Sequence, residues 1–142
     1  MSEVKVEVVG VFEQEIAVGG EEHRIPVVLL REPRDPPERE VRVPIGSCEA
    51  FAIQLAHEQQ VVPRPLTHDL ALRLLERLSA RLTRVVVDVL SAHHMHATLY
   101  LEAPEGEVTM EARPGDAIAL AMRADIPIYV KEDILASGSE AF

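Results

Sequence analysis

The sequence has one cysteine, Cys48, no tryptophan, and aromatic residues at only 4% of its 142 positions. One cysteine excludes a disulfide framework and a multi-cysteine zinc site within the chain. So few aromatic rings disfavour a base-stacking platform for nucleic acid. The sequence also lacks a P-loop, a dinucleotide-binding glycine pattern, a zinc-protease motif and a nucleophile elbow. The common signatures of catalysis are therefore missing.

Long apolar runs are missing as well. No run approaches the ~20 residues of a membrane-spanning helix, and the opening MSEVKVEVVGVFEQE alternates charge with valine, unlike a signal peptide. We therefore expect a cytoplasmic protein that has no membrane partner.

Basic residues are scarce, with 14 against 24 acidic residues and a net charge of −10. Such a chain repels nucleic acid at long range. The segment 64–84 is the exception, since it holds five arginines and two acids.

Apolar residues make up 47% of the chain, enough for the core of one domain. Gly19 and Gly20 indicate a hairpin between the first two of the strands that the apolar patterns predict. Those strands are expected at 4–12, 24–30, 41–45, 85–89, 95–101, 108–112 and 126–130. Successive strands joined by turns predict an α+β fold, a single domain over 1–136 with a mostly antiparallel or mixed sheet. A frayed tail is expected at 137–142.

Three main helices are predicted near 47–60, 67–79 and 114–124. Ser47 and Thr67 are suitable N-caps, and Pro114 suits a first helical position. Cys48 falls on the predicted buried face of the first helix. The stretch 117–122 is apolar all round, so the third helix should be the most buried.

Two parts of the sequence resemble each other. Three strands and a helix occur at 4–59 and again at 84–124, and EAFAI at 49–53 resembles DAIAL at 116–120. Duplication of a βββα unit is one interpretation, and it would make Glu49 and Asp116 equivalent. The alternative is that small-residue helices packed on sheets look alike.

Two helix starts carry candidate chemistry. In RPLTHD (64–69), a helix N-terminus with an imidazole and a carboxylate could hold an anion or a metal. In EARPGD (111–116), a carboxylate before an apolar helix is costly to bury unless Arg113 or a metal pairs with it. The alternative for both is structural, namely helix caps and local ion pairs.

Two further patterns are weaker. His94 and His96 share a strand face and could clamp a metal, although a solvated face or a turn explains them better. The stripe of Arg73, Arg77 and Arg81 could meet phosphates, or could be a solvated helix face or a dimer contact.

Three segments together resemble the bifunctional nuclease domain family: PIGSCEAFAIQLA (44–56), PRPLTHDL (63–70) and RPGDAIALAMRADIPIYV (113–130). The similarity extends from about Val4 to Leu135. It implies an α+β fold, a homo-oligomer and, for some members, nuclease activity on DNA and RNA. Gly115 departs from the family pattern, which has serine at that place.

The resemblance indicates which residues could form the site, and the chemistry of their side chains suggests a role for each. A chain this acidic needs a divalent cation, Mg²⁺ or Mn²⁺, to bring a phosphate near its carboxylates. We therefore expect a metal-dependent nuclease that hydrolyses phosphodiester bonds. The predicted metal ligands are Glu49, Asp69 and Asp116, the catalytic residues are His68, Arg64 and Arg113, and the substrate-binding residues are Thr67, Arg73 and Arg77.

The alternative is a non-catalytic oligomeric binding or regulatory module whose polar helix starts are structural braces. The distance between the polar helix starts in the folded chain distinguishes the nuclease from the non-catalytic module. The shared-site hypothesis predicts that the helix starts at 64–69 and 113–116 converge, with Glu49 nearby.

Overall fold

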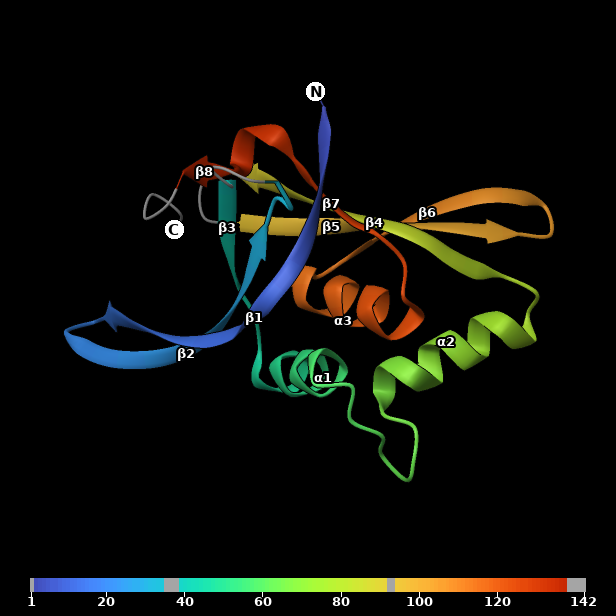
Figure 1. The fold of residues 1–142 in the computed structure, drawn as a ribbon, viewed down its shortest axis with the longest axis horizontal. Coiled ribbons are helices and arrows are strands. Elements are labelled where there is room, and N and C mark those ends of the chain that lie inside the picture. Colours follow the sequence, from blue (N-terminus) through green and yellow to red (C-terminus); the bar gives the residue numbers. More distant parts are fainter. Residues whose placement is uncertain (1, 35–38, 92–93, 138–142) are drawn as a thin grey trace.

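The computed structural model describes residues 2–34, 39–91 and 94–137, and Figure 1 shows the three helices gathered on one side of a curved sheet. The helices are α1 (Ser47–His57), α2 (Thr67–Arg77) and α3 (Pro114–Ala124), and a short 3-10 turn follows at Glu132–Ile134. The strands are β1 (Glu3–Val18), β2 (Glu21–Arg31), β3 (Arg39–Pro44), β4 (Arg81–Ser91), β5 (His94–Ala103), β6 (Gly106–Ala112), β7 (Ile128–Lys131) and β8 (Ala136–Ser137).

The sheet is mixed, with the strand order β6-β5-β4-β7-β1-β2-β3-β8. Every neighbouring pair is antiparallel except β4 and β7, which run parallel. The antiparallel pairs follow from short hairpin turns such as Gly19-Gly20, where both residues have positive φ. β7 instead returns after α3 and enters between the two antiparallel groups. The predicted α+β fold with a mostly antiparallel, mixed sheet is confirmed.

α3 is the central helix of the molecule. It contacts both other helices and also the strands β4 and β5. Ile118 is fully buried and Leu120 is 9% exposed. The prediction that the third helix is the most buried is confirmed, because a helix with no polar face needs packing on all sides.

The predicted N-caps of the first two helices are wrong by one residue. The caps are Gly46 and Leu66, neither of which has a capping side chain. Their backbone N–H groups instead donate to acids three positions later, Gly46 N to Glu49 Oε1 at 3.2 Å and Leu66 N to Asp69 Oδ2 at 3.0 Å. In α3 the cap is Arg113 and Pro114 is the first residue, as expected.

Two predicted faces also differ from the structure. Cys48 is exposed rather than buried, because α1 turns Glu49, Ala52 and Ile53 inward. On α2 the spacing of Leu70, Ala71, Leu74, Leu75 and Leu78 predicts an apolar stripe on the core, but this stripe is largely in solvent, with Leu74 57% exposed. α2 lies at the periphery, so only one edge of its apolar surface reaches the core.

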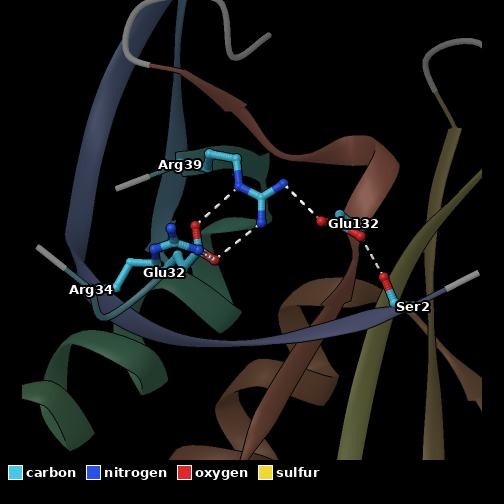
Figure 2. A network of polar contacts seen from close by, with 5 residues as sticks. All are labelled: Ser2, Glu32, Arg34, Arg39 and Glu132. Carbon is cyan, nitrogen blue, oxygen red and sulfur yellow. Dashed lines mark hydrogen bonds and ion pairs between the residues drawn. The ribbon is translucent and has the colours of Figure 1, made fainter. Parts of the chain in front are cut away.

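An ion-pair network joins segments that are far apart in the sequence (Figure 2). Arg39 donates two hydrogen bonds of 3.0 Å to the buried carboxylate of Glu32 and one of 3.1 Å to Glu132. Arg34 approaches Glu32 from the other side, and Ser2 donates to Glu132. The hydrogen bond from Arg39 is the main reason why the pKa of Glu32 is lowered.

Two expectations fall on residues that the structure does not describe. These are the tail over 138–142 and positions 35–38 of the solvated loop that the prolines of 32–40 predict. The two successions of three strands and a helix are present, but they do not establish a duplication, which stays a prediction. Within the described ranges, no helix combines the length and hydropathy needed to cross a bilayer.

Candidate functional site

The N-termini of the three helices meet, and four polar side chains lie together there. His68 Nε2 of α2 is 3.0 Å from Asp116 Oδ1 of α3, although 48 residues separate them. Arg113 Nε donates to Asp116 Oδ2 at 2.9 Å. The same guanidinium lies 3.8 Å from Glu49 Oε1 of α1. The predicted convergence of the two helix starts, with Glu49 nearby, is confirmed. We call these four residues the helix-start cluster.

The helix-start cluster opens to solvent on one side. The side chain of His68 is 11% exposed and that of Asp116 29%, whereas Arg113 is 72% exposed. Burial raises the pKa of Asp116, but hydrogen bonds from His68 and Arg113 outweigh it, so the pKa is lowered overall. Asp116 is therefore ionised at neutral pH, and because a carboxylate can only accept, His68 Nε2 donates to it.

Asp69 belongs to a different interaction, although it follows His68 directly. Arg123 near the end of α3 holds both its oxygens, with Nε to Oδ1 at 2.7 Å and Nη2 to Oδ2 at 2.9 Å. This hydrogen bonding is the largest reason why the pKa of Asp69 is lowered. The bidentate pair ties α2 to α3. The structure thus brings Glu49 and Asp116 together and directs Asp69 elsewhere.

The predicted metal ligands do not form a metal site as arranged. Across the described ranges, no group of three or more His, Cys, Asp or Glu side chains is placed to hold a metal ion. Arg113 lies between Glu49 and Asp116 and supplies the positive charge that a cation would bring. In this arrangement the residues do not fit a metal, so metal binding by Glu49, Asp69 and Asp116 would require the side chains to move, and it stays a prediction.

The remaining predicted residues lie beside the helix-start cluster rather than in it. Arg64 and Arg73 line a hollow of about 650 Å³ that also reaches Asp69 and Arg123. Thr67 is exposed at the first position of α2, and Arg77 is exposed but is not part of the hollow.

The histidine-rich strand does not contribute to the helix-start cluster. His94 is exposed at the start of β5. His96 Nδ1 lies 3.3 Å from Glu111 Oε2 on β6, which is within the range of an ion pair. The two groups are not aligned for a hydrogen bond. The pair is a local cross-strand contact.

Sequence reasoning missed Arg123, the partner of Asp69. The only signal is its position seven residues after Asp116, on the same face of α3 two turns later. It also missed why Gly46 precedes α1. A Cβ there would lie 2.7 Å from Glu49 Oε2, so glycine leaves room for the carboxylate to fold back on the cap.

Comparison with known proteins identifies the family of the chain. Residues 28–141 match the model of the bifunctional nuclease domain. The chain belongs to the bifunctional nuclease domain family. Two relatives from Mycobacterium tuberculosis, uncharacterized protein Rv1829 of strain H37Rv and uncharacterized protein MT1877 of strain CDC 1551, are each 39% identical to it over 111 residues. The match covers 78% of this chain and 65% of each relative, so the chain spans about 65% of their length.

Gly115, where the family pattern has serine, lies at a close contact between helices. A Cβ at this position would be 3.0 Å from Glu49 Cβ and 3.0 Å from Ile45 Cγ2. Both atoms lie close to their own backbones, Glu49 within α1 and Ile45 just before it, and they move little unless that segment moves. In this member of the bifunctional nuclease domain family, glycine therefore lets α3 approach α1 and helps to place Glu49 beside Arg113.

Proposed function

We propose that this chain is a nuclease that hydrolyses phosphodiester bonds of DNA and RNA at the helix-start cluster. The observation that carries the proposal is the hydrogen bond of 3.0 Å between His68 and Asp116, which joins two helix starts in an arrangement open to solvent. Membership of the bifunctional nuclease domain family supports the same activity. A buried imidazole oriented by a carboxylate is a common general base.

The chemistry needs only side chains of this chain. Asp116 would hold the His68 ring and stabilise its charged form, and Nδ1, which has no hydrogen-bond partner in the described part of the chain, would take a proton from the attacking water. Arg113, exposed and already held by Asp116, would stabilise the negative charge that develops on the phosphate. The oxygen of the leaving group would take a proton from solvent.

Catalysis without a metal step departs from the expected dependence on Mg²⁺ or Mn²⁺. That dependence stays a prediction, as do self-association, binding of nucleic acid and a cytoplasmic location.

The second candidate is the non-catalytic module, in which the same contacts are braces. Ion pairing of the acids favours it, because Asp69 is held by Arg123, and Asp116 and Glu49 are approached by Arg113. Such pairs need no ligand to keep buried charges satisfied.

A nuclease assay separates the two candidates. We would incubate labelled DNA and RNA with the wild type, Asp116→Asn and His68→Gln, each with Mg²⁺, Mn²⁺ or a chelator. Both variants should cleave about 100-fold more slowly or worse, since general-base catalysis contributes on that scale. The matched control is Asp133→Asn, which neutralises an exposed carboxylate in the 3-10 turn.

The outcomes are distinct. Cleavage by the wild type that survives in Asp116→Asn and His68→Gln would move the active site elsewhere. No cleavage by the wild type under any condition would favour the bracing module. Activity that vanishes with the chelator would restore the metal requirement.

A further inference from the structure

The hollow beside the helix-start cluster is a basic region in an acidic protein. It lies between α2, the start of β4 and the end of α3, and its volume is about 650 Å³. Its charged lining residues are Arg64, Arg73, Arg81, Arg123, Asp69 and Glu76, a net charge of +2. The whole chain carries −10. The hollow thus offers an anion a surface of net positive charge in a chain of net negative charge.

Two of these arginines have no ion-pair partner among the described residues. Arg123 is held by Asp69, and Arg81 Nη2 lies 2.9 Å from Glu102 Oε2. Arg64 and Arg73 form no ion pair in this part of the chain, and both are exposed. The only interaction found there for Arg73 is a weak electrostatic one with Asp69. Two guanidinium groups are therefore available to a ligand at one hollow.

Apolar side chains line part of the hollow. Pro63 and Pro65 stiffen the segment before α2, and Leu72 lines the hollow from the helix itself. Free guanidinium groups beside an apolar wall suit a ligand that has both a phosphate and a flat, less polar part. A nucleotide has this composition, because its phosphate binds arginine and its base and sugar pack on apolar surface.

The hollow adjoins the helix-start cluster through α2. Asp69 lines the hollow, and the preceding residue, His68, contacts Asp116 in the cluster. The segment that carries Arg64 leads directly into this helix start. A strand whose phosphate rests in the hollow would therefore reach His68 by passing around the start of α2, because the side chains of His68 and Asp69 point about 100° apart.

We propose that the hollow binds a backbone phosphate and the adjoining nucleoside of a nucleic-acid strand through Arg64 and Arg73. This assignment rests on the proposed nuclease function and names the surface that holds the substrate next to the helix-start cluster. Arg64 is then a binding residue rather than a catalytic one.

Binding can be measured apart from cleavage. We would follow the fluorescence anisotropy of a labelled single-stranded oligonucleotide of about ten nucleotides. The protein would be Asp116→Asn, so that the strand stays intact. Adding Arg64→Ala and Arg73→Ala together should weaken binding at least about tenfold. The same double variant should reduce the salt slope of binding by about one for each phosphate that the protein no longer neutralises.

The matched control is Arg24→Ala, which removes an exposed arginine from the distant hairpin strand β2 and should change affinity less than about twofold. Competition by a nucleoside monophosphate, by inorganic phosphate and by an uncharged nucleoside separates the parts of the ligand. The monophosphate should compete best, because it has both the phosphate and the base.

Several results would overturn the proposal. One is unchanged oligonucleotide binding in the double variant, and another is an effect of Arg77→Ala as large as that of Arg73→Ala, which would assign binding to the open helix face. Loss of self-association instead of nucleic-acid binding in the double variant would assign the hollow to a second copy of the chain. Oligonucleotide binding that depends on Arg64 and Arg73, in a chain that never cleaves, would retain the hollow and reject the nuclease.

Discussion

Equivalent residues in the three helices have different neighbours. Glu49, Asp69 and Asp116 each lie three positions after an N-cap, where an acid favours the helix macrodipole. Glu49 and Asp69 also accept a backbone hydrogen bond from the cap residue. Asp116 instead accepts side-chain hydrogen bonds from His68 and Arg113. At the scale of residues, capping explains why the acids are present, and tertiary packing decides what each contacts.

Asp69 should act as a brace between helices. Asp69→Asn removes the charge that Arg123 binds in a bidentate pair, so the free energy of unfolding at neutral pH should fall by about 1.5–3 kcal/mol. The pKa of Asp69 is lowered by folding, so its contribution is complete above the unfolded value of about 4 and is lost as pH falls through the lower folded value. Urea unfolding from neutral pH to about pH 3 measures this.

The difference between the wild type and Asp69→Asn should therefore shrink on acidification. An equal difference at both ends of the pH range would contradict the role of the charged pair. Asp133→Asn, on the exposed 3-10 turn, is the control and should leave stability within about 0.5 kcal/mol.

Restoring the family serine at position 115 should cost stability here. Gly115→Ser places a Cβ 3.0 Å from atoms of Ile45 and Glu49, so α1 must shift. We expect the free energy of unfolding to fall by about 1 kcal/mol, measured as a lower midpoint of thermal unfolding. Gly115→Ala, with the same Cβ, should show a similar loss. A midpoint equal to or above that of the wild type would mean that the helices adjust freely.

At the scale of elements, α3 links the sheet to the helix-start cluster. Its start carries Arg113 and Asp116, its end carries Arg123, and its middle is buried against the sheet and the other helices. α2 is the opposite case, since it reaches the core along one edge and is otherwise held to α3 by two polar pairs, Asp69 with Arg123 and His68 with Asp116. Displacement of α3 would therefore disturb both the core and the polar cluster.

Truncation in the two helices should reflect this difference. Ile118→Ala, at a fully buried position of α3, should reduce the free energy of unfolding by about 2–5 kcal/mol. Leu78→Ala, just after α2 and 72% exposed, should change it by less than about 0.5 kcal/mol. Urea unfolding monitored by circular dichroism measures both. Equal losses would show that the end of α2 is packed more tightly than its exposure indicates.

At the scale of the whole molecule, charge and apolar surface are unevenly distributed. The chain carries −10, yet five of its 14 basic residues lie on α2 or line the hollow, namely Arg64, Arg73, Arg77, Arg81 and Arg123. The same helix exposes Leu70 and Leu74, at 53% and 57%. Apolar side chains beside basic ones, in an acidic protein, offer a surface complementary to the rest of the molecule.

Self-association should follow from this surface. Light scattering at micromolar concentration should give a mass above that of the 15.7 kDa monomer. Leu74→Glu should lower that mass, because it places an acid within the exposed apolar face of α2, while Leu78→Ala should lower it less. A wild-type monomer would contradict self-association, and an unchanged oligomer in Leu74→Glu would place the interface elsewhere.

Local sequence patterns were sufficient to predict the three helices, seven of the eight described strands and their order, whereas the family came from the resemblance of three segments. Apolar alternation predicted the strands, and the apolar stretch 117–122 predicted the buried helix, because these patterns depend on local periodicity and on which side chains must leave water. Such patterns did not predict burial where it depends on the place of an element in the folded molecule. The leucines of α2 look like a core face, yet much of that face lies in solvent because α2 packs at the edge.

Which charges meet depends on the tertiary structure. The sequence placed His68 and Asp69 at one helix start and Asp116 at another, but it could not show that His68 contacts Asp116 whereas Asp69 turns to Arg123. Adjacent residues on a helix point about 100° apart, so the orientation of α2 against α3 selects a different partner for each. That orientation is set by the packing of many apolar side chains, and therefore no local motif contains it.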